Sequence, residues 1–183
     1  MVYADTGLPW VLPSPNIPSS RSAICYPSAG LVGEFNNYLQ VGIGYTIPFE
    51  VFGATWLDAE KLKAKLDSYN IPGTEFRVIY YKPFSGSASG QIVQGVQYFY
   101  TDYEAASLTM TQFYVMQAVR ELYPEKNPFE SGNRNQMFDK VCGTDKVRQL
   151  FSASFRIEDL VAFWTKDVED FRKISKKYYL YKK

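Results

Sequence analysis

FRVIYYKPFSGSASGQIVQGVQYFYT, residues 76–101, is the stretch that decides the fold class. Residues 76–81 combine aromatic and β-branched side chains, which are enriched in strands. Residues 93–101 have a similar composition and predict a second strand, in which Gly95 indicates a bulge or a close approach of another backbone. Between them, the Gly- and Ser-rich run from Pro83 to Gly90 predicts a flexible loop.

On both sides of this stretch the apolar spacing changes to that of a helix. Before it, Asp58 is the expected N-cap of a helix that ends at Asn70 with Pro72-Gly73. After it, Thr109-Met110-Thr111-Gln112 resembles a capping box, and the helix that follows stops before Pro124. The expected inward positions of the two helices are Leu62, Leu66 and Tyr69, then Val115, Val119 and Leu122.

The last 50 residues also show helical periodicity. A short helix is expected around Asn135 to Val141, ending at Gly143, with Thr144 capping the next one. From Ile157 to Ile174 the apolar residues form one stripe, which predicts a single long final helix. We interpret Trp164 in that stripe as a core residue. The stripe comprises Ile157, Leu160, Val161, Trp164, Val168, Phe171 and Ile174.

The first 52 residues lack a clear period. Residues 1–20 hold several prolines and are expected to form an extended strap or linker, anchored by Trp10 and Ile17. Residues 22–26 predict a short strand, residues 28–46 a Gly/Asn-rich loop, and residues 47–52 another strand. We therefore expect one α+β domain over residues 21–183, with a small mixed or antiparallel sheet from the first half packed with helices from the second.

Composition excludes several classes of function. The net charge of +1 argues against a nucleic-acid partner. The sequence contains no His, which removes Ser-His-Asp and Cys-His catalysis and the usual zinc sites. Gly42-x-Gly44 is not a dinucleotide fingerprint, so no cofactor and no metal are expected. Cys25 and Cys142 are either one bridge or two buried thiols.

No apolar run is long enough for a membrane span. The N-terminal residues Met1–Gly7 lack the basic start and apolar stretch of a signal peptide. The chain itself thus carries no signal for its compartment.

Several segments, in order over nearly the whole chain, resemble the C-terminal domain of the exo-β-N-acetylmuramidase family, formerly DUF1343. The central match is Pro48-Phe49-Glu50-Val51-Phe52-Gly53-Ala54-Thr55-Trp56, similar to the family's PFE-hydrophobic-GAPW segment. The other matches are Leu8-Pro9-Trp10, residues 13–18, Ile71-Pro72-Gly73, Phe76-Arg77, Gly95-Val96-Gln97, Leu122-Tyr123-Pro124, Phe138-Asp139, Gly143-Thr144-Asp145, Arg148 and residues 178–181. Residues 56–62 and 137–143 resemble a Bacteroides-type member.

The resemblance implies a function for the complete protein. Members of this family remove terminal N-acetylmuramic acid from the non-reducing end of peptidoglycan fragments. The resemblance also implies a partner, a Rossmann-like N-terminal domain that carries the catalytic acids, while the C-terminal domain closes one side of the cleft. It further implies a periplasmic or cell-surface location for the parent protein. No catalytic residue is therefore expected in this chain.

One position departs from the family pattern. Many members carry an Arg between two glycines in the segment before the PFE motif, whereas Ile43 occupies that place here. If that Arg binds the lactyl carboxylate of muramic acid, this protein must hold the carboxylate otherwise or prefer another sugar.

The candidate substrate-binding residues are polar side chains of the strap and of the Gly/Asn-rich loop. They are Asn16, Glu34, Asn36, Asn37 and Tyr45. Amides, carboxylates and phenols can hydrogen-bond sugar hydroxyls; the alternative for the asparagines is turn chemistry, because Asn binds its own backbone.

Two further functions remain open from the sequence. The chain could be a stand-alone peptidoglycan- or protein-binding module without catalysis. It could also be an independent hydrolase that uses Glu34 and Glu50, because glycoside hydrolysis needs two carboxyl groups flanking the scissile bond.

Overall fold

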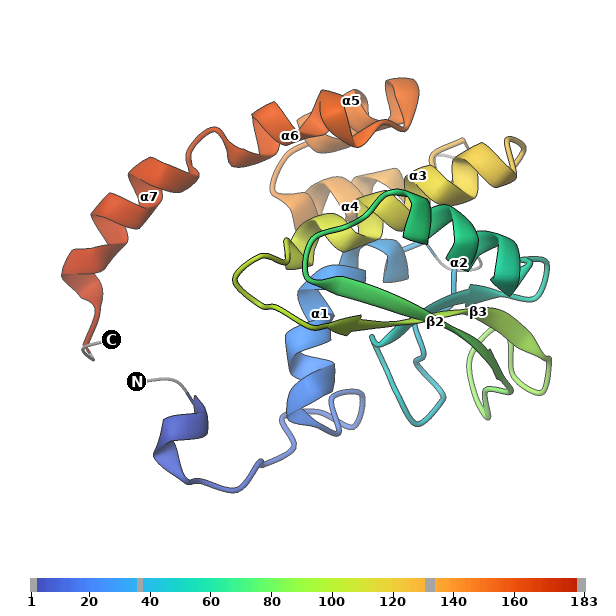
Figure 1. The fold of residues 1–183 in the computed structure, drawn as a ribbon, viewed down its shortest axis with the longest axis horizontal. Helices are drawn as coiled ribbons and strands as arrows, with labels where there is room; N and C mark the ends of the chain where they lie inside the picture. Colours follow the sequence, from blue (N-terminus) through green and yellow to red (C-terminus); the bar gives the residue numbers. More distant parts are fainter. Residues whose placement is uncertain (1–2, 36–37, 131–133, 181–183) are drawn as a thin grey trace.

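A computed structural model describes residues 3–35, 38–130 and 134–180 and shows an antiparallel sheet with helices stacked against one of its faces (Figure 1). The strands are β1 (Val51–Ala54), β2 (Thr74–Tyr81) and β3 (Val93–Tyr100), in the order β1-β3-β2. The helices are α1 (Ser20–Gly33), α2 (Ala59–Ser68), α3 (Thr111–Leu122), α4 (Asn135–Cys142), α5 (Lys146–Ser154), α6 (Ile157–Thr165) and α7 (Val168–Ser175). The predicted α+β class is confirmed.

Both outer strands, β1 and β2, pair with the central strand β3. Val51 lies opposite Gln97 on one side, and Thr74 lies opposite Tyr100 on the other. Because side chains alternate between the two faces of a strand, Val96 and Tyr98 point into the helical core, whereas Gln97 points to the other face. Tyr98 is fully buried and its ring stacks on Phe52 at a centroid distance of 5.2 Å.

At Gly95 the backbones of β3 and β1 lie close together. A Cβ added at Gly95 would lie 2.0 Å from the carbonyl oxygen of Phe52 and 2.5 Å from the Cα of Gly53. The close backbone approach predicted from this glycine is confirmed.

Helix α2 follows the sequence pattern closely. The Asp58 side chain accepts a hydrogen bond from the amide of Lys61 at 3.0 Å, as an N-cap does. Leu62 and Leu66 are fully buried against the sheet. Helix α4 likewise ends at Gly143, which has the left-handed conformation common after a helix.

The strand expected over residues 22–26 is wrong, because α1 runs through this region and past Pro27. The Ser19 hydroxyl caps its start by accepting from the amide of Ser22 at 3.0 Å. Proline lacks the amide hydrogen that would bond the carbonyl oxygen four residues earlier, but tertiary contacts hold the helix in place: the Tyr98 hydroxyl donates to the carbonyl oxygen of Cys25 at 3.1 Å. The predicted loop over residues 28–46 is consequently a helix as far as Gly33.

The capping box expected at Thr109 is also wrong. Helix α3 begins at Thr111, and the Gln112 side chain is buried between helices instead. Its Oε1 accepts from the amide of Leu31 at 3.0 Å, and its Nε2 donates to the carbonyl oxygen of Pro27 at 3.0 Å. Gln112 therefore joins α3 to the second half of α1.

The single final helix divides into α6 and α7 at Lys166 and Asp167. Ile157 and Leu160 of α6 are buried in the core. Trp164 packs edge-on against Phe113 at 5.4 Å, which confirms it as a core residue. Beyond Trp164 the apolar stripe continues, but its residues do not pack on the core. The single long helix predicted from periodicity is therefore wrong.

The N-terminal segment lies apart from the sheet and helices (Figure 1). A short 3₁₀ turn spans Tyr3–Thr6, and Ile17 packs against the core as an anchor. Trp10 is half-buried. Residues 47–50, expected to begin a strand, form turns instead, and β1 starts at Val51.

Two glycine substitutions test this packing. Gly95→Ala is expected to lower the free energy of unfolding by about 3 kcal/mol, because the new methyl group would overlap backbone that cannot move aside. Gly30→Ala in α1 is the matched control. Its Cβ meets only the ring of Tyr26, at 3.8 Å, and alanine favours the helix by about 0.5–1 kcal/mol. Urea unfolding followed by circular dichroism measures both, and equal losses would contradict the close approach at Gly95.

Candidate functional site

Helix α1 sets the distance between the candidate binding residues. Asn16 lies exposed before its first turn, and Glu34 is its C-cap. The helix has 14 residues, so about 21 Å of axis separates its ends at a rise of about 1.5 Å per residue. The structure therefore does not bring Asn16 and Glu34 together.

Glu34 is held by a cation from a distant part of the chain. Arg134, before α4, donates from Nη2 to the Glu34 Oε2 at 3.0 Å and from Nε to the Glu34 carbonyl oxygen at 2.7 Å. Both side chains are about one-third exposed. Arg134 was not singled out from the sequence, since no motif links positions 100 residues apart.

Two glycine-containing loops contact each other and form one surface. They are residues 38–50, before β1, and residues 82–92, between β2 and β3. The amide of Phe84 donates to the carbonyl oxygen of Gly44 at 2.8 Å, and the Gln40 Nε2 donates to the Ser87 Oγ at 3.1 Å. Gly44 has a φ of +81°, and a Cβ there would lie 2.4 Å from the Ser85 carbonyl oxygen. The contact thus requires glycine at position 44.

Tyr45 lies on this surface but is partly used in packing. Its ring contacts the ring of Tyr81 at 4.8 Å, over a small apolar cluster with Val51 and Val93 on the outer face of the sheet. Burial raises the pKa of Tyr81 well above its usual range. Tyr45 remains half-exposed and can present its hydroxyl to a ligand.

A small cleft opens between the two loops and the end of β1. Its volume is about 100 Å³, enough for about three water molecules, so it can hold one substituent of a sugar but not a whole ring. Amide and hydroxyl side chains surround the Trp56 indole there. The lining residues are Tyr38, Gln40, Ala54, Thr55, Trp56, Ser87, Ala88 and Gln91.

Two side chains that do not line the cleft also contact the Trp56 ring. The Tyr123 ring packs edge-on against it at 5.3 Å, and the Lys126 ammonium lies 4.9 Å from the ring centroid. Gln40, Trp56 and Gln91 were not among the candidate binding residues, because loop proximity, not sequence spacing, brings them together. Asn36 and Asn37, which were, lie outside the described residues.

Similarity to known proteins shows the family of this chain. Residues 24–181 match the family model described as exo-β-N-acetylmuramidase NamZ, C-terminal. The chain belongs to this family.

Individual relatives support the same family assignment. The chain is 34% identical over 181 residues to the peptidoglycan β-N-acetylmuramidase NamZ of Bacillus subtilis, covering 99% of this chain and 42% of that protein. A DUF1343 family protein of Bacteroides fragilis of known crystal structure is 46% identical, with a TM-score of 0.94, over 100% of this chain and 48% of that one. A second Bacteroides fragilis DUF1343 structure, 21% identical with a TM-score of 0.60 over 93% of this chain and 43% of that one, shares the fold. The chain thus spans less than half the length of the relatives it matches.

The NamZ family is named for a glycosidase, and glycosidases use two carboxyl groups that flank the scissile bond. In this domain the carboxylate of Glu50 has a structural role. Glu50 is buried beneath α1, and its Oε2 lies 2.7 Å from the Arg21 Nε. The Ser22 hydroxyl donates to its Oε1 at 3.3 Å and the Gln97 amide donates to its Oε2 at 3.3 Å. Each carboxylate oxygen of Glu50 therefore has a structural partner.

Glu34 and Glu50 are too far apart to flank one glycosidic bond. Glu50 contacts Ser22 in the first turn of α1, and Glu34 follows its last turn, about 18 Å along the axis. Retaining glycosidases separate their carboxyl groups by about 5–5.5 Å and inverting ones by about 6.5–9.5 Å. These two residues do not form a catalytic pair.

The two cysteines are poorly suited to act as nucleophiles. Cys25 and Cys142 are free. Burial, with the nearby Glu50 carboxylate, raises the pKa of Cys25 to about 11, and burial with Asp139 raises that of Cys142 to about 12. Because the thiolate is the nucleophile, the raised pKa values disfavour both thiols as nucleophiles near neutral pH.

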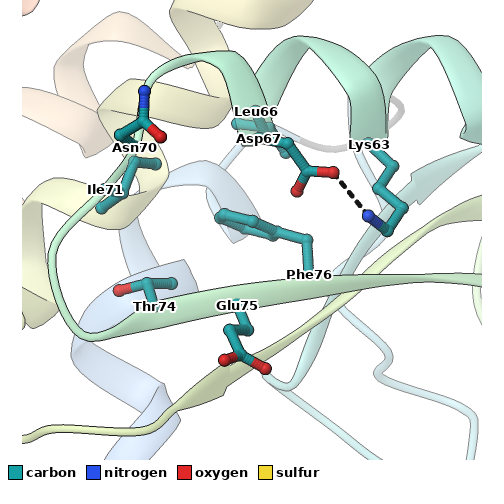
Figure 2. Close-up of a pocket in the computed structure, with 8 residues that line it drawn as sticks. All are labelled: Lys63, Leu66, Asp67, Asn70, Ile71, Thr74, Glu75 and Phe76. Atoms are coloured by element: carbon teal, nitrogen blue, oxygen red, sulfur yellow. Dashed lines mark hydrogen bonds and ion pairs between the residues drawn. The ribbon is translucent and has the colours of Figure 1, made fainter.

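A larger cleft of about 460 Å³ lies between α2 and β2 (Figure 2). Phe76 projects into it, whereas Glu75 points to the opposite side of the strand. Asp67 forms an ion pair with Lys63 along the helix. The carboxylates at this cleft do not converge, so the site offers no acid–base pair.

Across residues 3–35, 38–130 and 134–180, no group of three or more Cys, Asp or Glu side chains is arranged to hold a metal ion. Within the same ranges, no helix has the length and apolar content to cross a membrane.

Removing the two carboxylates should have unequal effects on stability. Glu50→Ala is expected to cost about 3 kcal/mol, since it strips a buried ion pair and leaves the Gln97 and Ser22 donors unsatisfied. Glu34→Ala, at a pair whose side chains are about one-third exposed, is expected to cost less than about 1 kcal/mol. Chemical denaturation gives both values, and a Glu34→Ala variant as unstable as Glu50→Ala would contradict these assignments.

Proposed function

We propose that this chain is the substrate-binding C-terminal domain of a complete exo-β-N-acetylmuramidase, which releases terminal N-acetylmuramic acid from peptidoglycan fragments. The observation that carries the proposal is the pairing of a glycosidase-family match over residues 24–181 with carboxylates that do not converge. A domain of this kind lines a cleft and leaves bond cleavage to groups from elsewhere in the protein.

The surface around Trp56 supplies the binding side of the cleft. Gln40, Ser87 and Gln91 offer amide and hydroxyl groups that can hydrogen-bond sugar hydroxyls or an acetamido group. Glu34 adds an acceptor: its ion pair with Arg134 uses Oε2, which leaves Oε1 for a sugar hydroxyl. Tyr45, in the loop before β1, is a further proposed contact; Asn36 and Asn37 remain proposed contacts from the sequence alone.

The catalytic acids of the complete protein are proposed to reside in a Rossmann-like N-terminal domain. The relatives have room for such a domain, because this chain spans 42% and 48% of their lengths. Since peptidoglycan is wall material, the complete protein would act in the periplasm or at the cell surface.

A stand-alone binding module without catalysis is less well supported. The family match and the Bacillus subtilis relative both carry the name of a muramidase. Ile43, 40% exposed in the loop before β1, leaves a position for a different lactyl contact or a different sugar.

Hydrolysis of a chromogenic N-acetylmuramic acid glycoside tests the division of labour. The 183-residue chain alone is expected to give no hydrolysis above background. The complete protein containing the preceding half should turn the substrate over. Turnover by the isolated chain at the rate of the complete protein would show that the catalytic groups lie within it.

Glu34→Gln in the complete protein tests the binding role. Loss of the charged acceptor is expected to raise KM about tenfold with kcat little changed, the effect of one weakened charge-assisted hydrogen bond of about 1.5 kcal/mol. Glu158→Gln, which alters a surface pair on α6, is the matched control and should leave both constants unchanged. A fall in kcat of several orders of magnitude for Glu34→Gln would instead assign it to the chemical step.

A further inference from the structure

Helix α7 and the turn after it present an exposed apolar face. Phe171 is 68% exposed, Ile174 55% and Tyr178 69%. These residues recur at intervals of three and four, so they lie on one side of the helix. No residue of α7, all of which are described, is buried.

The opposite side of α7 is charged and already paired. Arg172 contacts Glu169 at 2.7 Å, and Lys173 contacts Asp170 at 3.1 Å, each three residues apart on the helix surface. Solvent therefore suits this side, and the apolar side is the one that lacks a cover among the described residues.

The short length of α7 also indicates that another surface packs against it. It has eight residues, whereas isolated helices shorter than about 12–15 residues are marginal in water, because nucleation is costly and packing supplies most of the stability. A helix this short persists when its apolar face is buried against another surface.

The N-terminal segment has the same character. Leu8 is 65% exposed, Val11 77% and Leu12 59%. Figure 1 shows this segment and α7 both extending away from the sheet-and-helix body, on the same side of it in this view. The two chain ends thus form a pair of apolar arms, here defined as residues 8–12 and 168–180.

We propose that these arms clasp the half of the complete protein that precedes this chain, and that their apolar side chains form the interface between the two halves. The inference rests on the proposed function only in assuming that such a half accompanies this domain. The matched relatives are more than twice as long as the aligned region, which this chain covers as 42% or 48% of them.

A covalently linked neighbour suits small arms better than a separate molecule does. A domain in the same polypeptide is present at millimolar effective concentration, so a few apolar contacts suffice. Each large apolar side chain that becomes fully buried contributes about 1.5–3 kcal/mol.

Hydrogen–deuterium exchange tests the arms directly. Amides of residues 168–178 are compared in the 183-residue chain and in the same chain preceded by the non-matching half of the 46% identical Bacteroides fragilis relative. The preceding half is expected to slow their exchange at least ~100-fold. Phe171→Ser with Ile174→Ser should abolish the slowing, whereas Glu169→Ser with Lys173→Ser, two serines on the charged side, should keep it.

Unchanged exchange in the joined protein would overturn the proposal, as would equal effects of the two double variants. Slow exchange already in the isolated chain, with a dimer in light scattering, would assign the face to a second copy. Because a fusion can fail to fold, exchange is also measured on the intact Bacteroides fragilis relative; an unprotected matching helix there would again overturn it. Protected arms without muramic acid glycoside hydrolysis would sink the proposed function alone.

Discussion

The buried hydroxyl of Tyr98 joins helix α1 and the loop before β1 to the central strand β3. It reaches the carbonyl oxygens of Cys25 in α1 and of Phe49 in the loop before β1. Burial raises the pKa of Tyr98 well above its usual value, so the hydroxyl keeps its proton as a donor. One side chain of the central strand thus fixes both a helix interrupted by Pro27 and the loop that follows it.

That constraint determines where the polar groups lie. With α1 fixed against β3, Glu50 is locked under the helix start by Arg21, and Glu34 emerges at the helix end beside Arg134. The same arrangement turns Gln40 and Trp56 toward the loop of residues 83–91. The result is a surface with hydrogen-bonding groups around a rigid indole, but without two carboxylates at hydrolytic separation.

The proposed function and the proposed role of the apolar arms are consistent with each other. The proposed function places the catalytic acids outside this domain, and residues 8–12 and 168–180 carry exposed apolar side chains for the proposed contact with the preceding half. If the preceding half packs against both arms, their burial would fix the geometry of a cleft whose two walls come from separate folding units.

The sequence by itself determined the features that depend on near neighbours in the chain: the strands on either side of the 82–92 loop, the Asp58-capped helix, the close approach at Gly95, and, through motif order, the family. Only the tertiary structure decided the others. Helix α1 runs through Pro27 and is held by Tyr98 and Gln112, which contact Cys25 and Pro27 from more than 70 residues away. Asn16 and Glu34 are parted by the length of α1, the Arg134 contact and the Trp56 cleft arise from loops that meet in space, and the final apolar stripe breaks where the core ends. These outcomes depend on contacts between distant segments, whose energies local propensity and periodicity do not contain.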